Sequence, residues 1–168
     1  MTAPARALVD DIARLFARDL GAVRREVAAY PDDASPWRAL PGLPNCGGTL
    51  VLHLAGNLRH FVGAVLGGSG YVRDREAEFG NRDLSRAALD ALIEQTAAEV
   101  ARTMAAFDPS RMAEAYPVAI REQMVGMQRF LLHLVSHLTY HLGQLDAHRR
   151  VVTGDAQSID AVAIAPLA

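Results

Sequence analysis

Four histidines lie close together in a C-terminal stretch with helical periodicity, and they are the residues best suited to chemistry. They are His133, His137, His141 and His148. Side chains four positions apart on a helix differ by roughly 40° in direction and lie ~6 Å apart along its axis. The imidazoles of His137 and His141 can therefore converge on one metal ion, which an i, i+2 pair does not allow. His133 and His148 lie within a further ~40° of the same direction, so the spacing predicts one stripe of histidines.

An earlier segment, predicted to be a helix over 49–66, supplies a second group of polar residues. His53, Asn57 and His60 share one face of it, because positions four and seven residues on lie within about 40° of the first. One imidazole from this helix and two from the C-terminal helix would form a three-histidine site, with a coordination position left for water or substrate. Spacing alone does not say which histidines take part. It is equally compatible with boundary histidines of a helical core that bind no metal.

Four helices must position these side chains, and each is marked by apolar residues at spacings of three and four. We expect them over about 5–29, 49–66, 86–106 and 122–152. Thr49 and Ser85 are the expected N-caps of the second and third helices, and Gly154 closes the fourth. Residues 114–120 alternate briefly and are predicted to be extended. The tail, 155–168, is small and apolar and is predicted to pack back onto the helices in irregular form.

The predicted architecture is an all-α four-helix bundle that forms a single domain over residues 1–168. Prolines after the first helix and glycines after the second produce connections of about 18 residues. Such connections are too long for tight αα-hairpins. They indicate crossover connections or a functional rim around the site.

The composition narrows the class of protein. The chain has 168 residues, of which 51% are hydrophobic, and its formal net charge is −2. This composition supports a sizeable core and gives no electrostatic case for nucleic-acid binding. No apolar run reaches the roughly 18 residues that span a bilayer, no signal-peptide core is present, and the single Cys46 excludes an internal disulfide. We therefore expect a cytoplasmic protein with no nucleic-acid or membrane partner.

The string His137–Gln144, HLTYHLGQ, resembles the H-x-x-x-H-x-G-Q motif in the last helix of the DinB-like (YfiT-like) family of metal-binding four-helix bundles. The other ligand in that family is a histidine near the start of the second helix, and His53 matches it in position and surroundings. The resemblance implies a divalent transition metal, zinc or nickel, held by His53, His137 and His141. It also implies a homodimer. This chain departs from the family at Leu142, where an arginine is common, so any contact made by that arginine is vacant or has moved.

Further residues are candidates for roles around the metal. Gln144 and Asn57 are expected to orient an imidazole or a bound water. His60 is a candidate for the substrate pocket, and Arg73 and Arg75 are candidates to meet carboxylates of a substrate if their loop folds over the site. Each also has a simpler interpretation as a boundary residue or part of a solvated, salt-bridged loop. The sequence names no catalytic residue.

Three hypotheses for the function follow. The first is a metal-dependent enzyme, a thiol-dependent transferase or a hydrolase, whose ion binds a small molecule such as a low-molecular-weight thiol. A thiol suits the vacant position because metal binding as thiolate yields a nucleophile at neutral pH. The alternative is a non-catalytic metal- or ligand-binding helical dimer with a stress-related role. In a third hypothesis, the protein is a helical dimer whose histidines are purely structural.

Overall fold

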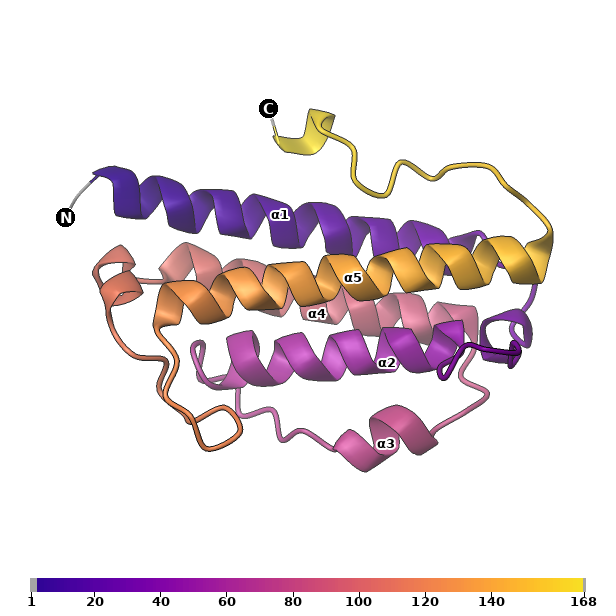
Figure 1. Cartoon of the computed structure of the whole chain (residues 1–168), viewed down its shortest axis with the longest axis horizontal. Helices are drawn as coiled ribbons and strands as arrows, with labels where there is room; N and C mark the ends of the chain where they lie inside the picture. The colour runs from indigo at the N-terminus through magenta and orange to yellow at the C-terminus, as the bar shows by residue number, and fades with distance from the viewer. Residues whose placement is uncertain (1–2, 168) are drawn as a thin grey trace.

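Four long helices form the body of the molecule: α1 (Ala3–Ala28), α2 (Gly47–Leu58), α4 (Arg86–Ala106) and α5 (Met127–Thr153). In this computed structural model, which describes residues 3–167, α1 packs against α4 and α5, and α2 packs against the same two helices. Figure 1 shows the four helices side by side, with α1 and α2 on opposite sides of α4 and α5. The described part of the chain contains no strand and only two isolated β-bridges. The predicted all-α four-helix bundle is confirmed.

The apolar stripes predicted from the sequence form the core. On α5 the buried leucines are Leu131, Leu134, Leu138, Leu142 and Leu145, each no more than 1% exposed. Two of the predicted helix ends are also confirmed. The Ser85 side chain accepts a hydrogen bond from the Ala88 amide at the start of α4, and Gly154 ends α5 in the left-handed conformation with φ of 71°. The histidine-bearing face of α5 is thus fixed in direction by its leucine face.

The prediction that Thr49 caps the second helix is wrong, because α2 begins at Gly47 with Cys46 as its N-cap. The two glycines let this end of the helix pack unusually close to the first connection. A Cβ on Gly48 would lie 2.5 Å from the Trp37 ring, so only glycine fits there. Trp37 itself lies in the short helix η1 (Ser35–Trp37) and donates from its indole to the Leu84 carbonyl at 2.9 Å.

The fourth helix begins at Met127, five residues later than the predicted start at 122. Residues 115–126 instead form a narrow hairpin, closed by the bridges Ala115–Gly126 and Ile120–Gln123. The hydroxyl of Tyr116, which is fully buried, donates to the Phe61 carbonyl at 2.6 Å and ties this hairpin to the bundle. The expected extended segment over 114–120 is one arm of this hairpin.

The connection after α2 carries a short additional helix. The last turns of α2 continue as the π-helical segment η2 (Arg59–Ala64), a form that is frequent at functional sites. The chain then enters α3 (Arg75–Gly80), which packs against α2 on the side away from α1 (Figure 1). The Asp74 side chain caps α3 by accepting from the Ala77 amide. The long second connection therefore forms a rim over α2, as its length suggested.

The C-terminal tail runs back beside α1, as Figure 1 shows in yellow. It includes the short helix η4 (Ala165–Leu167), which contacts α1. Its attachment relies on Arg149, a buried side chain that donates to the carbonyls of Asp155 and Gln157 at 3.0 Å each and is paired with Glu26 at 2.8 Å. The predicted irregular packing of the tail is confirmed for the residues up to 167. Across the described residues, none of the helices has the length and apolar character needed to cross a membrane.

Candidate functional site

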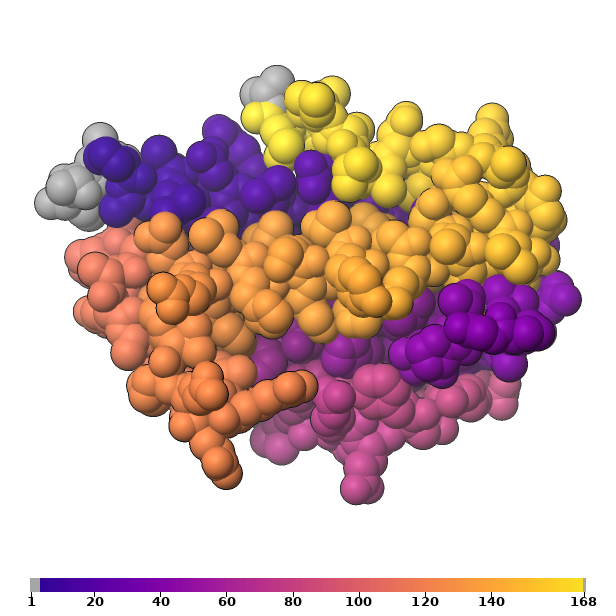
Figure 2. Space-filling model, in the orientation of Figure 1, coloured from indigo at the N-terminus to yellow at the C-terminus, as the bar shows by residue number. Residues whose placement is uncertain are grey.

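A pocket of about 1240 Å³ lies between α2, α3, α5 and the hairpin. Figure 2 shows its position on one face of the molecule, between the orange hairpin that precedes α5 and the magenta α3. Small-molecule sites typically occupy about 300–1000 Å³, so this pocket has room for two substrates together. The histidines of α2 and α5 line one part of it, and apolar side chains from α5, η2 and the hairpin line the other.

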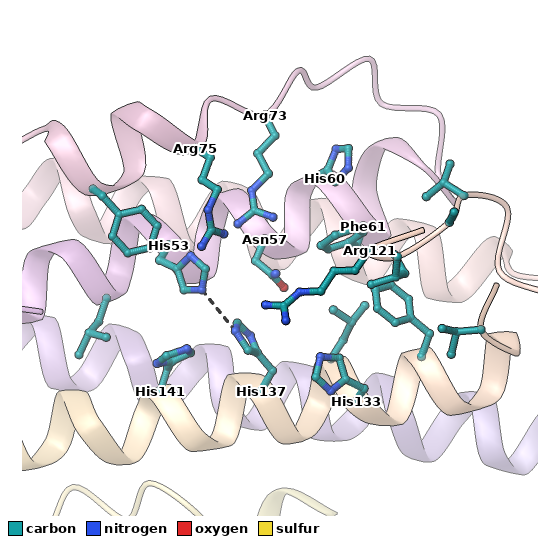
Figure 3. A pocket seen from close by; sticks show the side chains of 18 of the residues that line it. His53, Asn57, His60, Phe61, Arg73, Arg75, Arg121, His133, His137 and His141 are labelled. Atoms are coloured by element: carbon teal, nitrogen blue, oxygen red, sulfur yellow. Dashed lines mark hydrogen bonds between the residues drawn. The ribbon is translucent and has the colours of Figure 1, made fainter. Parts of the chain in front are cut away.

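Three of the predicted residues converge within the pocket (Figure 3). His53 of α2 and His137 and His141 of α5 present ring nitrogens that all lie within 4.8 Å of one another. The Nε2 atoms of His53 and His137 are 3.3 Å apart. Two nitrogens bound at about 2.0–2.1 Å to one tetrahedral zinc ion would be separated by about 3.3–3.4 Å. The spacing of this histidine cluster therefore fits a metal site.

Hydrogen bonds on the far side of two rings set their tautomers. His53 Nδ1 lies 3.0 Å from Glu78 Oε2, and His141 Nδ1 lies 2.6 Å from Gln144 Oε1. Carboxylate and amide oxygens only accept, so each Nδ1 carries the proton and donates it. The Nε2 lone pairs of both rings are then free to face the centre of the cluster, as metal-ligating histidines require. Gln144 thus accepts a hydrogen bond from the His141 ring.

The side chain that orients His53 is one that sequence reasoning missed. Glu78 lies on α3, is 4% exposed, and also accepts from Arg73 Nε at 2.6 Å and Nη2 at 2.8 Å. Burial by itself would raise the pKa of Glu78, but the hydrogen bonds from Arg73 and His53 outweigh burial and lower it. The carboxylate is therefore ionised at neutral pH. A Cβ on Gly56 of α2 would lie 2.1 Å from Glu78 Oε1, so a glycine is needed for α3 to approach this closely.

Two histidines of the cluster, His137 and His141, are held neutral. The pKa of His137 is lowered to about 4, mainly by burial and in addition by the neighbouring histidines and Arg73. The pKa of His141 is also lowered by burial, and the hydrogen bond to Gln144 offsets only part of that effect. Neutral imidazoles are the form that binds a metal cation. At neutral pH these two imidazoles therefore present lone pairs rather than positive charges.

The other predicted site residues line the pocket but lie outside the cluster. Asn57 is 7% exposed, and its Oδ1 has no hydrogen-bond partner among the described residues. His60 lies in the π-helical segment with its ring against Phe61, at a centroid distance of 4.7 Å. Of the two loop arginines, Arg73 is paired with the carboxylate of α3, whereas Arg75 lies over the Phe79 ring at 5.1 Å and borders the pocket.

The remaining two histidines of α5 separate from the cluster along the helix. His133 borders the pocket one turn before His137 and stacks on Phe130, with centroids 5.9 Å apart. His148 is fully buried between the Tyr30 hydroxyl at 2.6 Å and the Arg38 carbonyl at 2.8 Å. Its side chain points in a similar direction around the helix to those of the other three histidines, but it lies seven residues, or ~10 Å along the axis, beyond His141. The expectation of one continuous stripe is therefore wrong at His148, which joins the core under the first connection.

The decisive comparison is with a family model described as Mycothiol-S-transferase, which matches residues 11–154. The chain belongs to the mycothiol-S-transferase family. This family is part of the DinB/YfiT-like metal-dependent helical family, so the resemblance drawn from the HLTYHLGQ motif is confirmed. Neither a curated protein nor a solved structure matches the chain.

Membership of the mycothiol-S-transferase family identifies a thiol-dependent transferase and makes mycothiol, a low-molecular-weight thiol, the implied substrate. The family therefore favours the transferase over the hydrolase hypothesis. Leu142, which stands where the family commonly has an arginine, is 1% exposed and lies in the core. Arginines reach the pocket from other elements instead: Arg73 and Arg75 from the loop before and the start of α3, and Arg121, which the sequence did not single out, from the hairpin.

Proposed function

We propose that this protein transfers mycothiol to an electrophilic small molecule, with a divalent transition metal held by His53, His137 and His141. The observation that carries the proposal is the convergence of three imidazoles, with a 3.3 Å separation between the Nε2 atoms of His53 and His137. When bound there, zinc or nickel would hold a thiol as its thiolate, which supplies a nucleophile at neutral pH.

The residues around the cluster serve to position it. Glu78 and Gln144 hold the protons of His53 and His141 on Nδ1, so that both Nε2 atoms stay available. The unpaired Oδ1 of buried Asn57 can accept a hydrogen bond from a polar group of the thiol substrate. In the transfer itself the sulfur forms a bond to the electrophilic carbon, the leaving group departs with its bonding electrons, and the thiol proton passes to solvent.

The chain does not supply the thiol itself. Cys46 is its single cysteine, and it is 9% exposed at the N-terminus of α2, where its Sγ lies 3.2 Å from the Thr49 hydroxyl. It is absent from the lining of the pocket formed by the described residues. The nucleophile must therefore come from outside the chain, which is the arrangement that a thiol-dependent transferase needs.

The proposal is tested by combining metal analysis with a conjugation assay. Tag-free protein is expected to hold about one metal ion per chain and to couple mycothiol to 1-chloro-2,4-dinitrobenzene, with release of chloride. His137→Ala should lose both the metal and the activity, whereas His60→Ala, outside the cluster, should keep the metal. Full activity in His137→Ala, or in protein stripped of metal by a chelator, would show that the proposal is wrong.

We also propose that the protein forms the homodimer that its family resemblance implies. The supporting observation is the outer side of α5, where large apolar side chains remain exposed. Leu132 is 42% exposed, Tyr140 64% and Val151 66%. Large apolar side chains exposed along one helix would be buried in an interface between two copies of a chain.

A further inference from the structure

The pocket has an unbalanced charge. Among the described residues that line it there are three arginines and no aspartate or glutamate. Arg73 is neutralised by its bidentate pair with Glu78. Arg75 and Arg121 have no carboxylate partner within residues 3–167. The pocket therefore carries an uncompensated positive charge, although the chain as a whole has a formal net charge of −2.

Arg121 is an exposed residue that lies on an unfavourable backbone. It and Glu122 are the two central residues of the turn that closes the hairpin, and both are left-handed, with φ of 48° and 66°. Turns of this kind normally use Asn-Gly or Gly-Gly, because a side chain is disfavoured at positive φ. Figure 3 shows the Arg121 side chain extending from the hairpin into the pocket, toward Asn57 and His137. Strain that persists at a pocket is typical of a functional position.

The part of the pocket beside Arg121 is lined by aromatic and aliphatic side chains. Phe61 and Phe130 meet edge to face with their centroids 5.1 Å apart, and His133 stacks on Phe130. Further apolar side chains line the same region: Val118, Ile120, Val125 and Leu134. Aromatic side chains in such arrangements favour contact with another planar ring. This region is separate from the histidine cluster but opens into the same pocket.

We infer that the electrophile accepted by this transferase is an aromatic carboxylate. Its ring packs against Phe61 and Phe130, and its carboxylate pairs with the planar guanidinium of Arg121, a geometry that suits carboxylates. The inference rests on the proposed thiol transfer and names its second substrate. The volume of the pocket, about 1240 Å³, accommodates a thiol at the histidine cluster and the ring beside it.

The test compares two electrophiles of similar shape, the anionic 4-chloro-3-nitrobenzoate and the neutral 4-chloro-3-nitrobenzamide. Each kcat/KM is divided by the rate constant of the uncatalysed reaction with the thiol, because the carboxamide activates the ring more strongly than the carboxylate. With either one, a carbon–sulfur bond forms, chloride leaves with the carbon–chlorine electron pair, and the thiol proton goes to solvent. We expect the normalised kcat/KM for the benzoate to exceed that for the benzamide. Arg121→Gln should reduce the ratio of the two values about tenfold or more, since a hydrogen bond to a charged group is lost.

Arg14→Gln is the matched control, because it makes the same change at an exposed arginine of α1 away from the pocket. It should leave the ratio as it is in the unaltered protein. Arg121→Gly should reduce the ratio while raising Tm, because glycine accepts the left-handed backbone. A fall in Tm for Arg121→Gly would overturn the claim that the turn keeps its arginine for binding.

A binding measurement separates this inference from the proposed function. Calorimetric titration with 4-(methylthio)-3-nitrobenzoate, without thiol or turnover, should give a Kd about tenfold weaker in Arg121→Gln than in the unaltered protein. If both chlorides are conjugated but at equal normalised kcat/KM, or if Arg121→Gln keeps the ratio, the inference is wrong and the transferase proposal stands. If neither chloride is conjugated although 1-chloro-2,4-dinitrobenzene is, the inference is wrong and the transferase proposal stands. If 1-chloro-2,4-dinitrobenzene is not conjugated either, the transferase proposal fails, and the calorimetric result then supports or overturns the role of Arg121.

Discussion

Replacing Glu78 by glutamine should weaken metal binding, although Glu78 is not itself a proposed ligand. Its carboxylate accepts the His53 Nδ1 proton at 3.0 Å and two protons from Arg73 at 2.6 and 2.8 Å. Glutamine keeps the shape but has only one accepting oxygen, so its amide hydrogens must face one of these donors. Either His53 loses the bond that fixes its tautomer, or Arg73 loses half of its bidentate pair.

The expected magnitude has two parts. Removing a group that orients a metal-bound histidine typically raises the Kd for the metal about 10- to 100-fold, which is about 1.4–2.7 kcal/mol. The fold is also affected, because the side chains of Arg73 and Glu78 are only 13% and 4% exposed. Breaking a fully buried pair costs about 3–5 kcal/mol, but water in the pocket can reach Arg73, so we expect about 1–3 kcal/mol of lost stability.

Metal affinity is measured by competition with a chromophoric chelator, and stability by urea unfolding of the metal-free protein. Asp90→Asn is the control, because it breaks an equally short bidentate pair with Arg24, at 2.7 and 2.8 Å, away from the pocket. This variant should bind metal as tightly as the unaltered protein. A Kd for Glu78→Gln within twofold of the unaltered value, or an equal loss in Asp90→Asn, would refute the reasoning.

Three further predictions concern the site, the pH response and the assembly. Gly56→Ala should also weaken metal binding in the chelator competition, because its Cβ would lie 2.1 Å from Glu78 Oε1 and must displace that carboxylate. The free energy of unfolding of the metal-free protein, measured with urea, should decrease as pH falls from 6.5 toward 4. Over that range His137 becomes protonated in the unfolded chain but stays neutral in the folded chain, because folding lowers its pKa to about 4. His137→Ala should therefore make the free energy of unfolding less dependent on pH. Light scattering at micromolar concentration should give the mass of a dimer. Leu132→Glu, on the exposed side of α5, should reduce this mass to that of a monomer. A monomer mass for the unaltered protein would contradict the homodimer.

The spacing of the apolar residues was sufficient to predict that the four long helices exist and which way their side chains point. The leucine face of α5 is buried as its spacing requires, and that fixes where His137 and His141 point. The motif then selected His53 rather than His60 on the second helix. Spacing could not make that choice, because an ideal helix places both on one face, whereas the π-helical turn that begins at Arg59 changes the register before His60.

The site residues that could not be predicted from the sequence are positioned by contacts between distant segments. Glu78 stands in a run of charged residues that is typical of a solvated loop, and only the packing of α3 against Gly56 buries it. Asp74 as a cap, with acidic residues in the turn that follows it, was a local signal that a helix starts there. The role of Arg121 could not be predicted from the sequence either, because its turn contains none of the Gly or Asn residues that mark a hairpin.

The absorption spectrum of the cobalt-substituted protein tests the central claim most directly, because it reports the metal and the thiol together. Adding mycothiol, or another low-molecular-weight thiol at millimolar concentration, should produce a sulfur-to-cobalt charge-transfer band in the near ultraviolet. His137→Ala should eliminate the band, whereas His60→Ala should retain it. A spectrum that does not respond to thiol, or a band that persists in His137→Ala, would contradict a thiol-binding metal centre at His53, His137 and His141.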